Sequence, residues 1–157
     1  MAINSSYAWG KGMLKLLLVG TCCAAFACWL VADDRTRDYR SSEYKSRYDY
    51  FLFTHVAGAG SSILIWFLFL FAVTESCGSQ KCWAVLVFFI SIGLAVACVV
   101  AGGLTVEYAK DEKESFLYDL SDKYKWKADH RIASVAAAFV SSLLFFIDAI
   151  IHFKEVR

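Results

Sequence analysis

Long uncharged apolar stretches, separated by charged segments, dominate the chain. A bilayer core of about 30 Å needs roughly 20 apolar residues in a helix that rises about 1.5 Å per residue. The stretches do not alternate apolar and polar residues, as the strands of a membrane β-barrel would. The pattern therefore predicts an all-α, up-down bundle of four transmembrane helices, over residues of about 13–32, 50–74, 82–106 and 132–153.

The composition narrows the class of protein further. The chain has 157 residues, of which 59% are hydrophobic and 17% aromatic, whereas globular domains average about 45–50% apolar residues. A formal net charge of +1 provides no field that would attract nucleic acid. We expect an integral membrane protein that forms a single domain over residues 1–157, and we expect no nucleic-acid partner.

The first span has an alternative interpretation, because an N-terminal apolar stretch can be a cleaved signal peptide. Ala25-Phe26-Ala27 provides a cleavage site of small residues, but the apolar run continues through Val31. A membrane span is therefore favoured over a cleaved peptide. Lys15 lies near the start of this span, and we expect its long side chain to reach out to the membrane surface.

The third of the three predicted loops has a periodic pattern of its own. The loops cover residues 33–49, 75–81 and 107–131. Within residues 110–127, apolar side chains recur at helical spacing, which predicts a short amphipathic helix. We favour a lid over the bundle and keep a partner-binding surface as the alternative. The apolar positions are Phe116, Leu117, Leu120 and Tyr124.

The fourth span begins with small residues from Ser134, continues with aromatic residues, and carries Asp148 just before an alanine. This order resembles the last helix of the MARVEL-domain proteins, the tetraspan family of MAL, chemokine-like factor, synaptophysin and occludin. The short second loop and longer first and third loops also resemble that family. The resemblance implies a protein that organises membranes, or helps to assemble junction or vesicle complexes, in the plasma membrane or a vesicle membrane.

The charged residues that flank the spans, and the resemblance to the MARVEL family, bear on which side of the membrane the termini lie. Lys11 precedes the first span, Lys15 lies near its start and Asp33 follows it, which favours a cytoplasmic N-terminus. The larger number of Lys and Arg residues in the two long loops favours the opposite orientation. The family layout places both termini in the cytoplasm, and we adopt that orientation.

Two cysteines, Cys77 and Cys82, flank the short second loop. On the cytoplasmic side they are candidates for palmitoylation, and with the opposite orientation they are candidates for a small disulfide. A zinc site is weakly supported, because a single C-x₄-C lacks the second pair of ligands. Inert thiols remain the alternative to all three.

Small residues recur at four-residue spacing in the spans, which brings helix backbones close together in lipid. We expect them to pack the bundle against itself; the alternative reserves the stripe in the second span for another subunit. The candidates are Ala57, Gly58, Ser61 and Ser62 in the second span, with Ser134, Ala138 and Ser142 in the fourth.

Two polar residues, Asp148 and His55, lie inside predicted spans near their ends. An acid within the membrane is by default a candidate functional residue. We favour a contact between Asp148 and a Ser or Thr of a neighbouring helix over proton transport, with Lys154 close by.

The chain contains no glycine-rich phosphate loop, no H-E-x-x-H motif and no nucleophile elbow. The positions of the three histidines do not favour haem. We therefore expect a non-enzymatic protein without a metal or cofactor, whose partners are membrane lipids and other membrane proteins or a second copy of itself. The alternative function is an accessory subunit of a larger channel, receptor or transporter.

Overall fold

The computed structural model describes residues 7, 9–32, 42–71, 79–115 and 117–156. These residues form four long helices, α2 (Lys11–Ala32), α3 (Ser42–Leu70), α5 (Gln80–Glu114) and α7 (Asp122–Val156), and one short helix, α6 (Leu117–Leu120). The four long helices are long enough and apolar enough to cross a membrane. They confirm the four helices expected from the hydrophobic pattern, and they indicate a multi-pass membrane protein.

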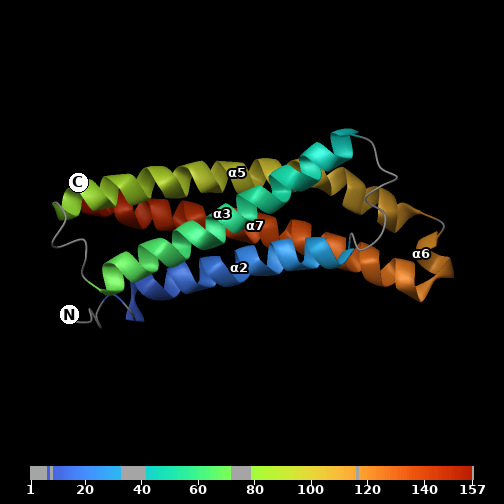
Figure 1. Ribbon diagram of the computed structural model, residues 1–157, viewed down its shortest axis with the longest axis horizontal. Coiled ribbons are helices and arrows are strands. Elements are labelled where there is room, and N and C mark those ends of the chain that lie inside the picture. The colour runs from blue at the N-terminus through green and yellow to red at the C-terminus, as the bar shows by residue number, and fades with distance from the viewer. Residues whose placement is uncertain (1–6, 8, 33–41, 72–78, 116, 157) are drawn as a thin grey trace.

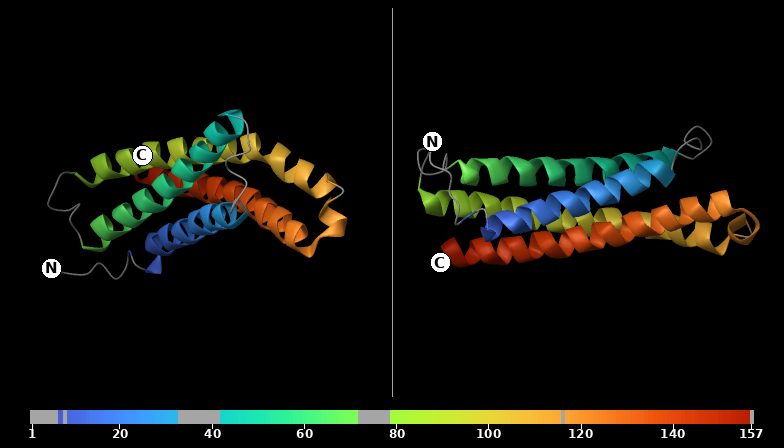
Figure 2. Two further views of the ribbon diagram at one scale, coloured as in Figure 1. Left: turned by 45° about the vertical axis from the view of Figure 1, so that its right-hand side comes forward. Right: turned by 90° about the horizontal axis from the view of Figure 1, so that it is seen from below.

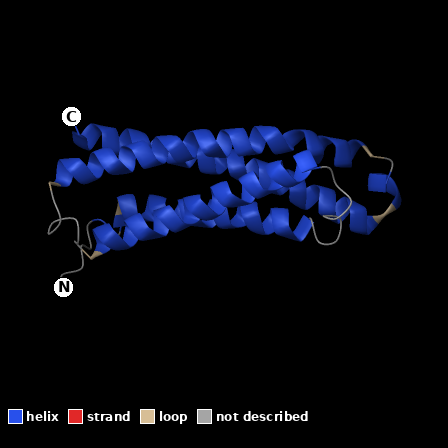
Figure 3. Cartoon of the chain, turned by 45° about the horizontal axis from the view of Figure 1, so that its top comes forward, coloured by secondary structure: helices blue, strands red, loops and turns tan. Residues whose placement is uncertain are grey.

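Consecutive long helices are neighbours around the bundle, as Figures 1 and 2 show. Helix α2 packs against α3, α3 against α5, and α5 against α7, while α7 also packs against α2. The start of α2 and the end of α7 lie at one end of the bundle, here called the terminal end. Helix α6 lies at the opposite end, called the loop end. Figure 3 shows the described connection between α5 and α7, which contains α6, at the loop end.

Helices α5 and α7 are longer than the membrane requires. Each has 35 residues, which corresponds to about 52 Å, and the pair extends past α2 at the loop end (Figure 1). Helix α5 starts at an N-cap, Ser79, whose side chain accepts a hydrogen bond from the Cys82 amide. Aspartate Asp122 in the first turn and Lys154 in the last turn of α7 match the helix dipole.

The third loop differs from its prediction. Residues 107–131 are mostly helical, because α5 continues to Glu114 and α7 begins at Asp122. The single amphipathic helix expected over this segment is wrong: the backbone is extended at Ser115, with ψ at 138°, and α6 ends at Leu120 before α7 begins at Asp122. A new helix then starts after Ser121, whose carbonyl accepts from the amides of Tyr124 and Lys125. Only the four-residue α6 lies between them.

The apolar part of the interior consists of two clusters, which follow one another along the length of the bundle. Towards the loop end, the rings of Trp29, Tyr48 and Phe51 pack among small side chains. Towards the terminal end, Leu18 and Phe145 pack with the thiols of two buried cysteines.

The outward faces of the helices are apolar as well. Large side chains such as Phe53, Leu64, Phe89 and Leu143 are between 60% and 74% exposed. Exposed apolar surface of this extent marks a face that contacts something other than water. Lipid hydrocarbon is the expected neighbour for these four helices.

Candidate functional site

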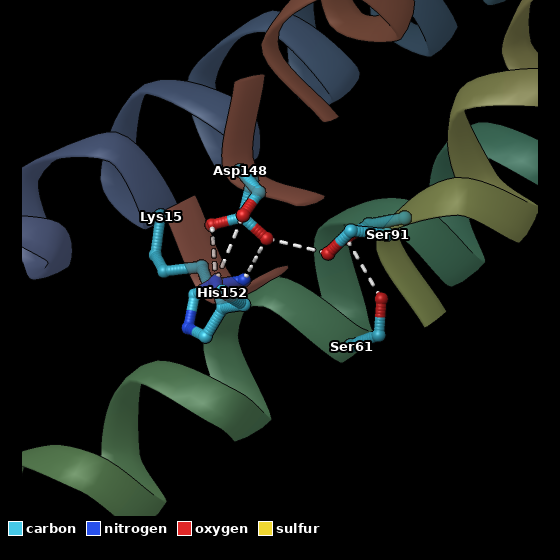
Figure 4. A network of polar contacts seen from close by, with 6 residues as sticks. Lys15, Ser61, Ser91, Asp148 and His152 are labelled. Carbon is cyan, nitrogen blue, oxygen red and sulfur yellow. Dashed lines mark hydrogen bonds and ion pairs between the residues drawn. The ribbon is translucent and has the colours of Figure 1, made fainter. Parts of the chain in front are cut away.

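The most polar part of the interior is a cluster at the terminal end, shown in Figure 4. The Nζ atom of Lys15 on α2 donates to Oδ2 of Asp148 on α7 at 2.6 Å. The hydroxyl of Ser91 on α5 donates to the same oxygen at 2.5 Å. Both charged side chains are only 1% exposed. Together with His152, these residues are called the Asp148 cluster, which joins three of the four long helices.

His152 follows Asp148 by one helical turn and is completely buried. Its Nδ1 atom lies 2.9 Å from the carbonyl oxygen of Asp148 and 3.7 Å from the carboxylate Oδ1. Because a carbonyl oxygen only accepts, Nδ1 carries a hydrogen in this contact. The second nitrogen, Nε2, has no hydrogen-bond partner among the described residues.

Aromatic rings cover the Asp148 cluster at the terminal end. The Tyr7 ring stacks on Phe69 at 5.1 Å between centroids, and Phe69 meets the His152 ring edge-on at 6.3 Å. Burial raises the pKa of the Tyr7 hydroxyl above its ordinary value of 10.0, and the Asp148 carboxylate raises this pKa further. The phenol therefore stays neutral beside the carboxylate.

A second charged cluster lies towards the loop end and joins all four long helices. The Nη1 atom of Arg131 on α7 lies 2.7 Å from Oε1 of Glu112 on α5, and the Arg131 side chain is 1% exposed. Its guanidinium carbon lies 5.0 Å from the ring centroid of Trp29 on α2 and 5.7 Å from that of Tyr44 on α3. A planar cation between aromatic rings is a favourable contact. These four residues are called the Arg131 cluster.

Four buried hydroxyls of α5 and α7 bond to the backbone. The hydroxyls of Thr105, Ser134 and Ser141 donate to carbonyl oxygens of their own helices. The hydroxyl of Ser142 donates to the carbonyl of Ala95 on α5. Each of these four hydroxyls directs its hydrogen at a backbone carbonyl oxygen rather than at another side chain.

His55 of α3 is completely buried, and its ring packs against Phe51. Its Nδ1 atom is 2.8 Å from the Phe51 carbonyl. No hydrogen-bond partner for its Nε2 atom occurs in the part of the chain that the structure describes. Among the described residues, the hydrogen bond of His55 is thus to its own helix, and it belongs to neither the Asp148 cluster nor the Arg131 cluster.

The small residues singled out from the sequence lie at helix contacts. Gly58, Ser62, Ser134, Ala138 and Ser142 are buried, whereas Ala57 and Ser61 are half-buried. A Cβ atom on Gly58 would lie 3.1 Å from the Cys22 sulfur and 3.3 Å from the Phe145 ring. Close contact between α3, α2 and α7 thus depends on the absence of a side chain at this position.

The remaining candidates are at the two ends of the bundle. Cys82 is an exposed free thiol in the first turn of α5, whereas Cys77 and Phe116 lie outside the described residues. Leu117 and Leu120 are in α6, and Tyr124 is half-buried near the start of α7. The structure thus divides the predicted apolar stripe between two helices.

Sequence reasoning missed the partners of both buried charge pairs. Lys15 was expected to reach the membrane surface, which is wrong, because its side chain turns inward to Asp148. Lys15 rather than Lys154 supplies the cation beside Asp148, while the Ser91 contact is of the expected kind. A signal was present: the first span begins and the fourth ends on the same side, so Lys15 and Asp148 lie at similar depth. Arg131 is the last residue of the predicted third loop, and nothing in the sequence indicated that it pairs with Glu112.

The described residues contain no group of three or more His, Cys, Asp or Glu side chains that could hold a metal ion. Comparison of the chain with protein-family models, with curated proteins and with solved structures gives no match. The function of the two clusters is therefore inferred from their own residues.

Proposed function

We propose that this protein is a non-enzymatic tetraspan membrane protein that organises assemblies within the membrane, as its resemblance to MARVEL-domain proteins implies. The observation that carries the proposal is the internal pairing of its buried charges. Lys15 forms an ion pair with Asp148, and Arg131 forms one with Glu112. The apolar outer faces of the helices are left for contacts with lipids and with other proteins.

Internal pairing disfavours two other uses of these charges. A subunit that recruits a partner through a charge within the membrane needs that charge to be unpaired, because only an unsatisfied charge gains strongly from a new partner. Proton transport needs a connected chain of groups that exchange protons, whereas Thr105, Ser134 and Ser141 donate to backbone carbonyls. Both clusters are better suited to fixing the four helices in one arrangement.

The size of the complex tests this proposal against the accessory-subunit alternative. The full chain is purified from its native membrane in mild detergent, and the mass of the particle is measured. We expect the chain alone or in several copies, with bound lipid. Co-purification of an unrelated large membrane protein at a fixed ratio would contradict the proposal and support an accessory subunit.

An organising role also requires a change in the membrane around the protein. A fluorescently labelled chain, reconstituted at increasing density in giant vesicles, is expected to gather into patches. The variant Lys15→Met is the control, since it destabilises the arrangement of the helices that presents the outer faces and is expected to form fewer patches. A uniform distribution of the unaltered chain at every density would argue against an organising role.

The proposed orientation places both termini in the cytoplasm, in the plasma membrane or a vesicle membrane. Protease treatment of intact cells that express the chain with a tag after Arg157 tests this orientation. We expect the tag to be protected. Digestion of the tag from outside intact cells would reverse the assignment.

A further inference from the structure

The outer face of the α5–α7 pair carries a hollow of about 500 Å³. Val96 and Val99 line it from α5, and Phe139, Leu143 and Phe146 line it from α7. The one polar side chain in its lining, Ser142, already donates its hydrogen to the Ala95 carbonyl. The hollow therefore offers apolar contacts to an occupant and little opportunity for hydrogen bonding.

A second hollow, of about 240 Å³, lies between the same two helices nearer the loop end. Its floor is apolar, formed by Val106 and Ala109 of α5 with Ile132 and Val135 of α7. Two lysines, Lys110 and Lys113, complete its lining. Lys110 lies 3.7 Å from Glu114 in an exposed ion pair, which is weak enough to be exchanged for another anion.

The two hollows follow one another along one face of the helix pair. Val99 and Val106 are seven residues apart on α5, which is about two turns and returns to the same face. Between them, Gly103 has open space where its side chain would be. Phe139 rests on the backbone at Gly102 beside this gap, since a Cβ atom on Gly102 would meet its ring at 3.3 Å. An unbranched chain can therefore pass over Gly103 from one hollow to the other.

The two lysines lie at the depth of lipid headgroups. The apolar stretch of α5 ends at Val106, and a rise of about 1.5 Å per residue places Lys110 about 6 Å and Lys113 about 10 Å beyond it. The polar region on each side of a bilayer is about 5–8 Å thick, and a lysine side chain can bend back towards it. Basic pockets between transmembrane helices at this depth are suited to phosphate headgroups.

We infer that the α5–α7 face is a phospholipid-binding site. Lys110 and Lys113 bind the phosphate, and an acyl chain runs over Gly103 into the apolar hollow beside Leu143. The charge at one end and the apolar surface along the rest match the two parts of a phospholipid. This inference depends on placement of the four helices in a membrane and is independent of the proposed organising role.

Lipid titration of the full chain in mild detergent tests the site, with bound lipid counted by native mass spectrometry. The probes are phosphatidylglycerol and diacylglycerol with the same acyl chains, so that they differ only in the phosphoglycerol headgroup. We expect diacylglycerol to bind about tenfold more weakly, because it loses the charge-assisted hydrogen bonds. The double variant Lys110→Gln/Lys113→Gln is expected to weaken phosphatidylglycerol binding about tenfold and to leave diacylglycerol binding unchanged.

A second variant, Gly103→Leu, fills the passage between the hollows and is expected to weaken binding of both lipids. Gly60→Leu is its control, because Gly60 is also exposed on a long helix with open space at its Cβ position. Lys123→Gln/Lys125→Gln is the charge-matched control for the lysine pair. Thermal unfolding in the same detergent establishes that each variant is folded.

Three results would overturn the inference. Equal binding of the two lipids would show that the lysines do not bind the phosphate. Displacement of phosphatidylglycerol by millimolar inorganic phosphate would indicate a phosphate site without an acyl chain. Loss of a dimer mass in Gly103→Leu, with lipid binding unchanged, would assign this face to a second copy of the chain.

Discussion

Lys15 and Asp148 are 133 positions apart in the chain, yet the ammonium of one donates to the carboxylate of the other at 2.6 Å in the buried interior. This pair connects the first long helix to the last and holds Ser91 of α5 against the same oxygen. A charge left alone in such a place is strongly unfavourable, so each residue of the pair depends on the other.

Lys15→Met is expected to lower the free energy of unfolding by about 3–5 kcal/mol, because it leaves the Asp148 carboxylate buried without its cation. The double variant Lys15→Met/Asp148→Leu removes both charges and is expected to recover most of this loss. Equilibrium unfolding in detergent measures both effects.

Lys11→Met is the control for this pair, since Lys11 pairs with Glu155 at a half-exposed position one turn earlier on α2. Its effect is expected to stay below about 1 kcal/mol. Equal losses for Lys11→Met and Lys15→Met would contradict a special role for the buried pair.

Arg131→Lys keeps the positive charge beside Glu112 but removes the planar group between Trp29 and Tyr44. We expect a loss of about 1–2 kcal/mol in the free energy of unfolding. Arg47→Lys is the control, because Arg47 also lies near a carboxylate and a ring, those of Glu107 and Tyr108, at a more exposed position. A loss no larger than that of Arg47→Lys would mean that charge alone matters at Arg131.

Gly58→Val forces a side chain against Cys22 and Phe145, whose nearest atoms are 3.1 and 3.3 Å from the Cβ position. Such overpacking is expected to lower the free energy of unfolding by about 1–3 kcal/mol. Gly60→Val introduces the same side chain two residues later, where nothing lies within 4 Å, and is expected to change stability by less than about 0.5 kcal/mol. Thermal and chemical unfolding of both variants, measured in parallel, decides whether α3 packs as described.

Tyr118 in α6 donates a hydrogen bond to Asp129 of α7 at 3.0 Å. This bond raises the pKa of the Tyr118 phenol above its ordinary value of 10.0, since it favours the protonated form. The contact therefore stabilises the folded chain below pH 10 and is lost as the pH rises through the higher pKa of the folded state.

Phenolate absorbance, compared between the unaltered chain and Tyr118→Phe, isolates the titration of this residue. We expect its midpoint to lie above pH 10, and Asp129→Asn to bring the midpoint down towards the ordinary value. A midpoint that does not respond to Asp129→Asn would contradict the α6–α7 contact.

The amino-acid sequence determined the four long helices of this protein and their order. Uncharged stretches of about 20 residues can satisfy their backbone groups in hydrocarbon only by bonding within a helix. The short second loop can only connect neighbouring antiparallel helices, so the up-down arrangement was also predictable. Asp148 was recognisable as an unusual residue, because an acid inside an apolar span is rare.

The sequence also set limits on what could be predicted at the loop end. Apolar spacing over residues 116–124 suggested one amphipathic helix, whereas the end of α6 at Leu120 and the start of α7 at Asp122 divide this segment between two helices. Helical periodicity alone does not reveal such a break, because serine is compatible with both a helix and its end.

Only the tertiary structure decided which charges meet. The rotation and the relative height of each helix determine whether Lys15 faces the interior or the lipid, and the apolar spans can pack in several ways that differ little in hydrophobic burial. Pairing of Lys15 with Asp148 and of Arg131 with Glu112 favours the observed arrangement, because an arrangement that separated either pair would leave a charge unpaired in a medium of low dielectric constant. The sequence supplied the charges, and the packing of the four helices selected their partners.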